Sequence, residues 1–214
     1  MNKIELRNML PAVFVSRTDV EGDIWKQDVT FERGGLYLIE AASGTGKSSL
    51  CSYILGHRSD YEGTLLFDGR DTRTLKTAEW VKLRRHSISL LFQELRLFPE
   101  LTAYENVAIK NNLTKHKSRE QILHWFDELG IADKMGVKAG RMSYGQQQRV
   151  ALMRALVQPF DFLFADEPVS HLDDENSRIM GRILMEEARA QGAGVIVTSI
   201  GRHIDLAYDK IYRL

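Results

Sequence analysis

Eight consecutive residues, from Ala41 to Ser48, restrict what this chain can fold into more than any other part of its sequence. The segment Ala41-Ala42-Ser43-Gly44-Thr45-Gly46-Lys47-Ser48 matches the template G-x-x-x-x-G-K-[ST] except at the first position, where alanine replaces glycine. A short β-prone run at residues 36–39 precedes it, and Lys47-Ser48-Ser49-Leu50 opens a helix. This order of strand, loop and helix predicts a loop that binds phosphate.

The small residues of this loop explain its chemistry. They let consecutive backbone N–H groups turn inward around an anion, and the helix that starts at Lys47 adds its positive dipole end. Lys47 would reach the β- and γ-phosphates of a nucleotide, and the Ser48 hydroxyl would bind magnesium. The candidate binding residues are Ser43, Gly44, Thr45, Gly46, Lys47, Ser48 and Ser49. The alternative is a chance turn of small residues with a capping lysine.

The hydrophobic pattern around the loop predicts an α/β fold. Continuous apolar runs at residues 162–165 and 195–198 are typical of strands covered on both faces, as in a parallel sheet, and residues 211–214 form a candidate last strand. A helix is expected over about residues 174–190.

Two further units are expected beside this core. Residues 93–157 contain helical patterns and no convincing strand, which indicates a helical subdomain inserted into the core. Residues 1–40 and 60–69 are richer in alternating, turn-broken runs, which favour an antiparallel sheet. Because a domain typically holds about 150 residues, we expect residues 1–214 to form a single one.

An acidic pair, Asp166-Glu167, follows the apolar run at residues 162–165. The carboxyl ends of parallel strands converge on a ligand crevice, so this pair is expected near the phosphate loop. There Asp166 would hold magnesium through water, and Glu167 would polarise the attacking water. The alternative is an ordinary acidic start of a turn.

A second candidate for anion binding is the start of a helix at Ser143-Tyr144-Gly145-Gln146. Ser143 and Gln146 have the S-x-x-Q spacing of a capping box, and Gly145 lets an anion approach the backbone closely. In the alternative, these residues only cap a core helix. One nucleotide in one chain does not need two separate anion-binding helix ends.

Charge and composition narrow the class of protein. Lys and Arg number 29 and Asp and Glu number 29, so the formal net charge is zero, which argues against a nucleic-acid partner. No run approaches the ~20 apolar residues that cross a bilayer, and the N-terminal run lacks the features of a signal peptide. The one cysteine, Cys51, excludes an intramolecular disulfide framework. We therefore expect a cytosolic chain.

Several segments together resemble the ATP-binding cassette (ABC) ATPases: residues 41–48, Phe92-Gln93-Glu94, residues 142–154, residues 162–173 and residues 195–198. The most specific is the signature Ser-Tyr-Gly-Gln-Gln-Gln-Arg-Val-Ala from Ser143 onward. Residues 97–107 are most similar to the lipoprotein-release, macrolide-export and FtsE-type cell-division group. The resemblance implies a P-loop NTPase fold of ABC type, with a RecA-like parallel-sheet core, an antiparallel β subdomain and an α-helical subdomain.

The resemblance also implies roles for individual residues. Gln93 is the Q-loop glutamine, which senses the γ-phosphate and magnesium beside the membrane subunit, and residues 170–173 resemble the D-loop. The implied catalytic residues are Glu167, Gln93 and Lys47. The implied magnesium ligands are Ser48, Gln93 and Asp166. Phe14, 33 residues before Lys47, is a candidate to stack on adenine, or else a plain core residue.

Partners follow from the same resemblance. In this family two cassettes pair head to tail, and each ATP lies between one chain's P-loop and the other's signature, here Ser143, Gly145 and Gln146. The implied cofactors are ATP and Mg²⁺, and the implied partners are a second ABC ATPase chain, identical or not, and transmembrane permease subunits. The expected location is cytoplasmic, peripheral on the inner face of the cell membrane.

Three positions depart from the family pattern. Ala41 and Tyr144 stand where glycine is usual, and Ser199 stands where the switch histidine is usual. His203, four residues further on, is either a substitute or a surface histidine. A missing imidazole would weaken transition-state stabilisation more than ATP binding.

Two functions are therefore compatible with the sequence. One is the energising subunit of a transporter or related membrane complex. The other is a slowly hydrolysing, nucleotide-gated regulator or the degenerate half of a heterodimer. DNA-repair and translation cassettes rank below both, because they usually bring coiled-coil insertions, a second cassette or basic arms.

Overall fold

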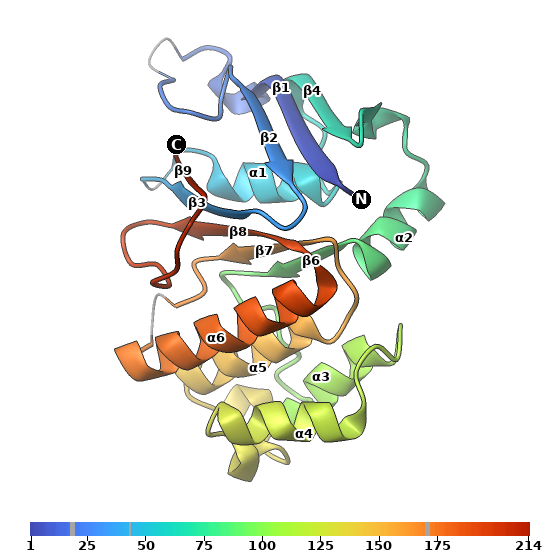
Figure 1. Ribbon diagram of the computed structural model, residues 1–214, viewed down its shortest axis with the longest axis vertical. Helices are drawn as coiled ribbons and strands as arrows, with labels where there is room; N and C mark the ends of the chain where they lie inside the picture. Colours follow the sequence, from blue (N-terminus) through green and yellow to red (C-terminus); the bar gives the residue numbers. More distant parts are fainter. Residues whose placement is uncertain (18–19, 43, 170–171) are drawn as a thin grey trace.

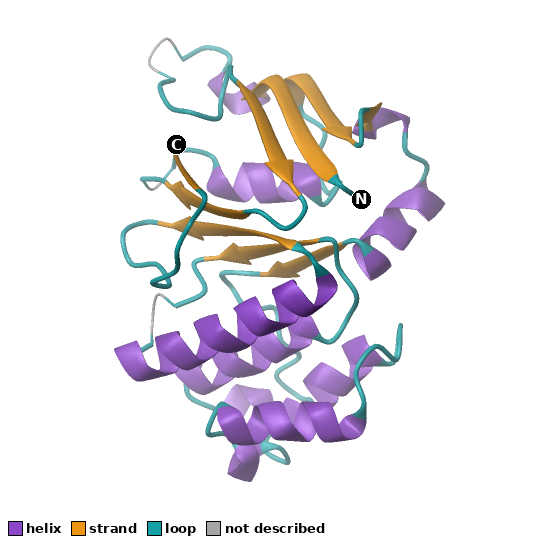
Figure 2. Ribbon diagram, in the orientation of Figure 1, coloured by secondary structure: helices purple, strands orange, loops and turns teal. Residues whose placement is uncertain are grey.

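The structure is a computed structural model that describes residues 1–17, 20–42, 44–169 and 172–214. Its strands are β1 (Lys3–Pro11), β2 (Asp28–Glu32), β3 (Leu36–Glu40), β4 (Tyr61–Phe67), β5 (Arg70–Asp71), β6 (Ile88–Leu91), β7 (Phe162–Asp166), β8 (Gly194–Ser199) and β9 (Lys210–Arg213). Its α-helices are α1 (Lys47–Ile54), α2 (Thr77–His86), α3 (Ala103–Asn111), α4 (Arg119–Glu128), α5 (Tyr144–Leu156) and α6 (Asp174–Gln191). Figure 2 shows two sheets, with α1 between them and α3 to α6 beyond the larger one.

The larger sheet is the parallel core that the sequence predicts. Its order is β6-β7-β8-β3-β9, and every neighbouring pair is parallel. Strands β7 and β8 are buried along their whole length, because α1 covers one face of the sheet and α5 and α6 cover the other (Figure 1). Burial on both faces is the physical reason for the continuous apolar runs in these strands. The predicted last strand is present at the sheet edge as β9.

The smaller sheet is the predicted antiparallel unit, in the order β2-β1-β4-β5. It packs over α1, whose Leu50, Tyr53 and Ile54 are buried in a cluster that also contains Phe31 of β2 and Phe164 of β7. Helix α1 is therefore held between the two sheets, and its first residue lies at the phosphate loop.

The predicted helical subdomain contains α3, α4 and α5. Ser118 caps α4: the Gln121 N–H donates to the Ser118 hydroxyl at 3.2 Å, and the Ser118 N–H donates to the Gln121 side-chain oxygen at 3.0 Å. Phe126 of this helix is fully buried. Helix α5 packs on α3 and also contacts β6 and α6, so it joins the helical subdomain to the parallel sheet. Across the described residues, every helix is too short or too polar to span a membrane.

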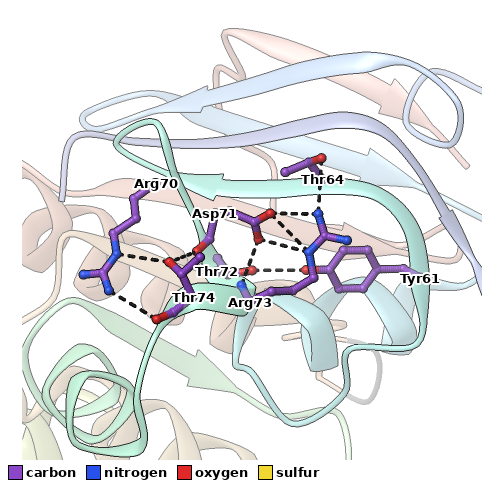
Figure 3. A network of polar contacts seen from close by, with 7 residues as sticks. All are labelled: Tyr61, Thr64, Arg70, Asp71, Thr72, Arg73 and Thr74. Carbon is purple, nitrogen blue, oxygen red and sulfur yellow. Dashed lines mark hydrogen bonds and ion pairs between the residues drawn. The ribbon is translucent and has the colours of Figure 1, made fainter.

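A polar network fixes the corner after β4 (Figure 3). The Arg73 guanidinium pairs with the Asp71 carboxylate at 2.7 Å, and the backbone N–H of Arg73 donates to the same carboxylate at 2.9 Å. The hydroxyls of Tyr61 and Thr72 lie 3.1 Å apart within this corner. The network sets the direction in which the chain leaves the antiparallel sheet toward α2.

Candidate nucleotide site

The predicted functional segments gather at one edge of the parallel sheet. The phosphate loop follows β3, Asp166 ends β7, and Gln93 lies in the turn after β6. The register pairs Asp166 with Thr198 and Glu40 with Ser199, so the loop after β8 lies between the acidic pair and the phosphate loop. Convergence at the carboxyl ends of parallel strands is what the sequence predicts for a ligand site.

Two glycines shape the phosphate loop. Gly44 has φ +82° and Gly46 has φ +101°, both in the left-handed region that favours glycine. A Cβ on Gly46 would also lie 2.9 Å from the Phe14 ring and 3.0 Å from the Trp25 ring. The Trp25 indole N–H donates to the Thr45 carbonyl at 2.8 Å. The aromatic side chains of Phe14 and Trp25 therefore pack against the loop.

Alanine at the first position of the loop is compatible with its backbone. Ala41 is not among the non-glycine residues with positive φ, and its N–H donates to the Ser199 carbonyl at 2.9 Å. Because the position does not need a left-handed conformation, the departure from glycine introduces no strain there.

Lys47 and Glu167 meet at the loop. The Lys47 ammonium lies 3.7 Å from a Glu167 carboxylate oxygen, and both side chains are more than nine-tenths buried. Glu167 has φ +50°, which is unusual for a residue with a side chain, and its N–H donates to the Thr198 carbonyl at 3.2 Å. Backbone conformations of this kind are enriched at functional sites, where surrounding structure holds them in place.

Asp166 has the properties expected of a magnesium ligand. It is buried, and its carboxylate accepts a hydrogen bond from the Thr198 hydroxyl. Burial raises the pKa of Asp166 above its ordinary value, while the Thr198 hydrogen bond and the Lys47 charge act to lower it. Ser48 is an exposed residue in the first turn of α1. Hydroxyl and carboxylate oxygens are the donors that Mg²⁺ prefers, so these residues fit the ion.

The signature segment forms the predicted helix end. The Gln146 N–H donates to the Ser143 hydroxyl at 3.3 Å, and the Ser143 N–H donates to the Gln146 side chain at 3.0 Å, which confirms the capping box. Gly145 is half-buried in the first turn. Further along α5, the buried Gln148 amide donates to the Pro168 carbonyl at 2.5 Å, so this helix is also tied to the turn after the acidic pair.

Gln93 is half-buried in a turn, and the Tyr144 hydroxyl donates to its main-chain carbonyl at 2.9 Å. Nothing in the local sequence pattern indicates this contact, since 51 residues separate the two positions. The sequence likewise predicts no individual role for Trp25, Thr198 or Gln148, because their contacts form between segments that are distant along the chain.

The loop after β8 is organised by Ser199 itself. The Ser199 hydroxyl accepts a hydrogen bond from the Gly201 N–H at 3.0 Å and donates one to the Arg202 carbonyl at 2.9 Å. His203 stacks edge-on against Tyr208 and lines a cavity of about 450 Å³ against α6. Among the described residues that line this cavity, none belongs to the phosphate loop.

Phe14 lies beside the phosphate loop but is only 6% exposed. The Arg17 guanidinium covers its ring at 4.6 Å, and Gly46 and Trp25 pack near it. The position is compatible with a support for the loop, and a base could stack on the face of the ring that Arg17 covers only after Arg17 moved. Of the other predicted residues, Ser43 and the D-loop pair Ser170-His171 lie outside the described residues, whereas Asp173 caps α6 by accepting the Asn176 N–H at 2.8 Å.

The sequence profile of the ABC transporters matches residues 26–170. This chain belongs to the ABC transporter family. It is an ATP-binding cassette with the ATPase fold of that family.

Individual relatives agree with this assignment. The lipoprotein-releasing system ATP-binding protein LolD of Syntrophotalea carbinolica is 30% identical over 214 residues, which cover 99% of the cassette and 94% of LolD. The macrolide export ATP-binding/permease protein MacB of Shewanella sp. (strain W3-18-1) is 31% identical over 190 residues, which cover 87% of the cassette. The cassette matches 29% of the length of that MacB protein.

Solved structures confirm the predicted fold. The dimeric structure of MJ0796, a bacterial ABC transporter cassette, superposes with a TM-score of 0.78 at 26% identity, covering 92% of this chain and 88% of that one. The dimeric post-hydrolysis state of MJ0796 bound to ADP and Pi superposes with a TM-score of 0.76 at 25% identity, covering 92% and 87%.

Proposed function

We propose that the cassette binds ATP with Mg²⁺ and hydrolyses it to drive a separate transmembrane complex. The observation that carries the proposal is the meeting of Lys47 and Glu167 at the phosphate loop, which leads into a helix held between two sheets. A triphosphate and the Glu167 carboxylate would compete for the same ammonium group. ATP bound at Lys47 would therefore release Glu167 to act on water.

The chain's own residues supply the remaining steps. Ser48 and Asp166 would hold Mg²⁺, with Gln93 as the third ligand, and the bound ion would neutralise charge on the β- and γ-phosphates. Glu167 would accept a proton from the water that attacks the γ-phosphorus. The bond from that phosphorus to the bridging oxygen then breaks, and ADP and phosphate leave. Lys47 balances charge on the phosphates throughout.

A second cassette would complete each site. The capped end of α5, with Ser143, Gly145 and Gln146, presents backbone N–H groups and the positive end of a helix dipole. We propose that this end contacts the ATP held by a partner cassette, identical or not. The dimeric state of MJ0796 supports this arrangement.

Permease subunits are the proposed membrane partners. The names of LolD, an ATP-binding protein of a releasing system, and of MacB, an ATP-binding protein joined to a permease, support such a partner. The cassette would then lie on the cytoplasmic face of the cell membrane, attached through that partner.

Hydrolysis with matched variants tests this function. Phosphate release from MgATP should be measured for the purified cassette alone and after co-expression with a permease partner. Glu167→Gln should remove the activity while keeping ATP binding. Glu186→Gln, an exposed carboxylate of α6 that pairs with Arg182, is the control and should leave the rate unchanged. Equal activity in the parent and Glu167→Gln would refute the assignment of the site.

A further inference from the structure

Tyr144 occupies a position where the family pattern has glycine, and its side chain reaches across to the Q-loop. Tyr144 is the first residue of α5, and its hydroxyl donates to the main-chain carbonyl of Gln93, 2.9 Å away. A glycine at this position has no atoms that could make this contact. The hydrogen bond therefore depends on the Tyr144 side chain.

The Q-loop turn depends on contacts from outside itself. Leu95 and Arg96 follow Gln93 with φ +60° and +50°, two consecutive residues in a conformation that costs energy for residues with side chains. Such conformations persist when the surrounding structure holds them. Helix α5 does so at both ends of the turn, because Tyr144 bonds to the Gln93 carbonyl and Arg154 donates to the Arg96 carbonyl.

Helix α5 is capped at its start and anchored in the core along its length. It has 13 residues, its N-terminus is closed by the Ser143 capping box, and Val150, Leu152 and Leu156 are fully buried. A shift of the Q-loop at Gln93 would therefore be passed to the first turn of α5 through the phenol of Tyr144.

We infer that Tyr144 is a positioning residue that ties the Q-loop to the signature end of α5. This inference rests on the proposed function, in which Gln93 contacts the nucleotide of its own chain and the signature contacts the nucleotide of the partner. Through Tyr144, nucleotide at the first site sets the position of the helix end that serves the second site.

The phenol remains a donor under ordinary conditions. Burial raises the pKa of Tyr144, and the carboxylates of Glu94 and Glu167 raise it further, so the hydroxyl stays protonated at neutral pH. Tyr144 as a whole is 41% exposed. Tyr144→Phe therefore removes the donor without leaving a cavity in the core, and the melting temperature should change little.

Hydrogen–deuterium exchange of the cassette with Mg²⁺ and a non-hydrolysable ATP analogue tests the inference. The protein is kept at a concentration where light scattering shows a monomer, so a partner cassette cannot protect the signature. In the parent, the analogue should slow exchange at residues 44–50 and also at residues 142–147. In Tyr144→Phe, protection at residues 44–50 should remain and the response at residues 142–147 should be lost. Tyr144→Gly should behave in the same way.

A matched control is available in Tyr53, whose hydroxyl donates to the Asp60 carbonyl at 3.0 Å. Tyr53→Phe removes the same type of hydrogen bond away from the Q-loop, and it should keep the response at residues 142–147. An equal response at residues 142–147 in the parent and Tyr144→Phe would overturn the inference while leaving the proposed function intact. No protection at residues 44–50 in the parent would overturn both.

Steady-state kinetics give a second readout. A hydrogen bond of this kind contributes a modest net free energy, so its loss should raise the KM for ATP about three- to tenfold in Tyr144→Phe and leave kcat within about twofold. A fall in kcat with an unchanged KM would instead place Tyr144 in the chemical step and contradict a positioning role.

Discussion

Replacing Ser199 with histidine tests whether the loop after β8 limits the rate of ATP hydrolysis. The Ser199 hydroxyl is occupied by its own loop, since it bonds to the Gly201 N–H and the Arg202 carbonyl, and the residue is 1% exposed. Serine has no imidazole that could contact the γ-phosphate, and its hydroxyl is already engaged by these two bonds. One donor to charge that develops in a transition state contributes about 10²–10³ in rate. We expect slow turnover in the parent. Ser199→His should raise the rate constant for hydrolysis by up to about 10²–10³-fold while changing ATP affinity little.

The structure also predicts a cost in stability. The substitution removes two hydrogen bonds, each worth about 0.5–1.5 kcal/mol net, so the free energy of unfolding should fall by about 1–3 kcal/mol. A larger ring at a buried position adds an overpacking penalty of about 1–3 kcal/mol. For a chain of this length each kcal/mol lowers the melting temperature by about 2–4 °C. Ser199→Ala loses the same hydrogen bonds without gaining a donor or a larger ring.

Three measurements check this prediction. Single-turnover phosphate release at saturating MgATP gives the rate constant, calorimetry gives the ATP affinity, and thermal unfolding gives the stability. Ser199→His should be faster than both the parent and Ser199→Ala, although both variants melt earlier. The reasoning is wrong if Ser199→His is no faster than Ser199→Ala. It is equally wrong if the parent hydrolyses ATP rapidly and His203→Ala removes that activity.

Other substitutions test the rest of the site. Lys47→Ala should abolish ATP binding in calorimetry, because the loop loses the cation at the β/γ position; unchanged affinity would mean that nucleotide binds elsewhere. Glu167→Gln should keep ATP binding and accumulate a dimer with MgATP in size-exclusion chromatography, since an amide holds water without accepting its proton. Phe14→Ala should weaken ATP binding by about 1–3 kcal/mol if the ring stacks on adenine after Arg17 moves; an equal loss of inorganic triphosphate binding would instead assign Phe14 to support of the loop. Asp166→Asn should raise the free energy of unfolding measured in urea at pH 7 without Mg²⁺, because the raised pKa of Asp166 means that its charged form destabilises the folded chain. That gain should disappear as the pH falls below the ordinary pKa of aspartate, where Asp166 is protonated in the folded and the unfolded chain alike.

Local sequence determined the elements that carry the site. The small residues before Lys47 predicted the loop, because the freedom to adopt a positive φ belongs to glycine itself. Gly46, at φ +101°, is an example. Ser143 and Gln146 predicted the start of α5 for the same reason, since a capping box joins residues three apart. The apolar runs predicted the parallel strands, and their order along the chain placed the acidic pair at the correct edge of the sheet.

Tertiary packing decided how these elements act on one another. The ion pair of Lys47 with Glu167 joins two segments that are more than a hundred residues apart in the sequence. Folding brings the ammonium and carboxylate groups to within 3.7 Å of each other. The hydrogen bonds of Tyr144 to Gln93 and of Trp25 to Thr45 depend on the positions of whole helices and loops. Residue types and their spacing do not predict distances between segments that are far apart in the sequence. A serine at position 199 can be read from the chain, but its engagement within its own loop becomes visible only once the backbone has folded around it.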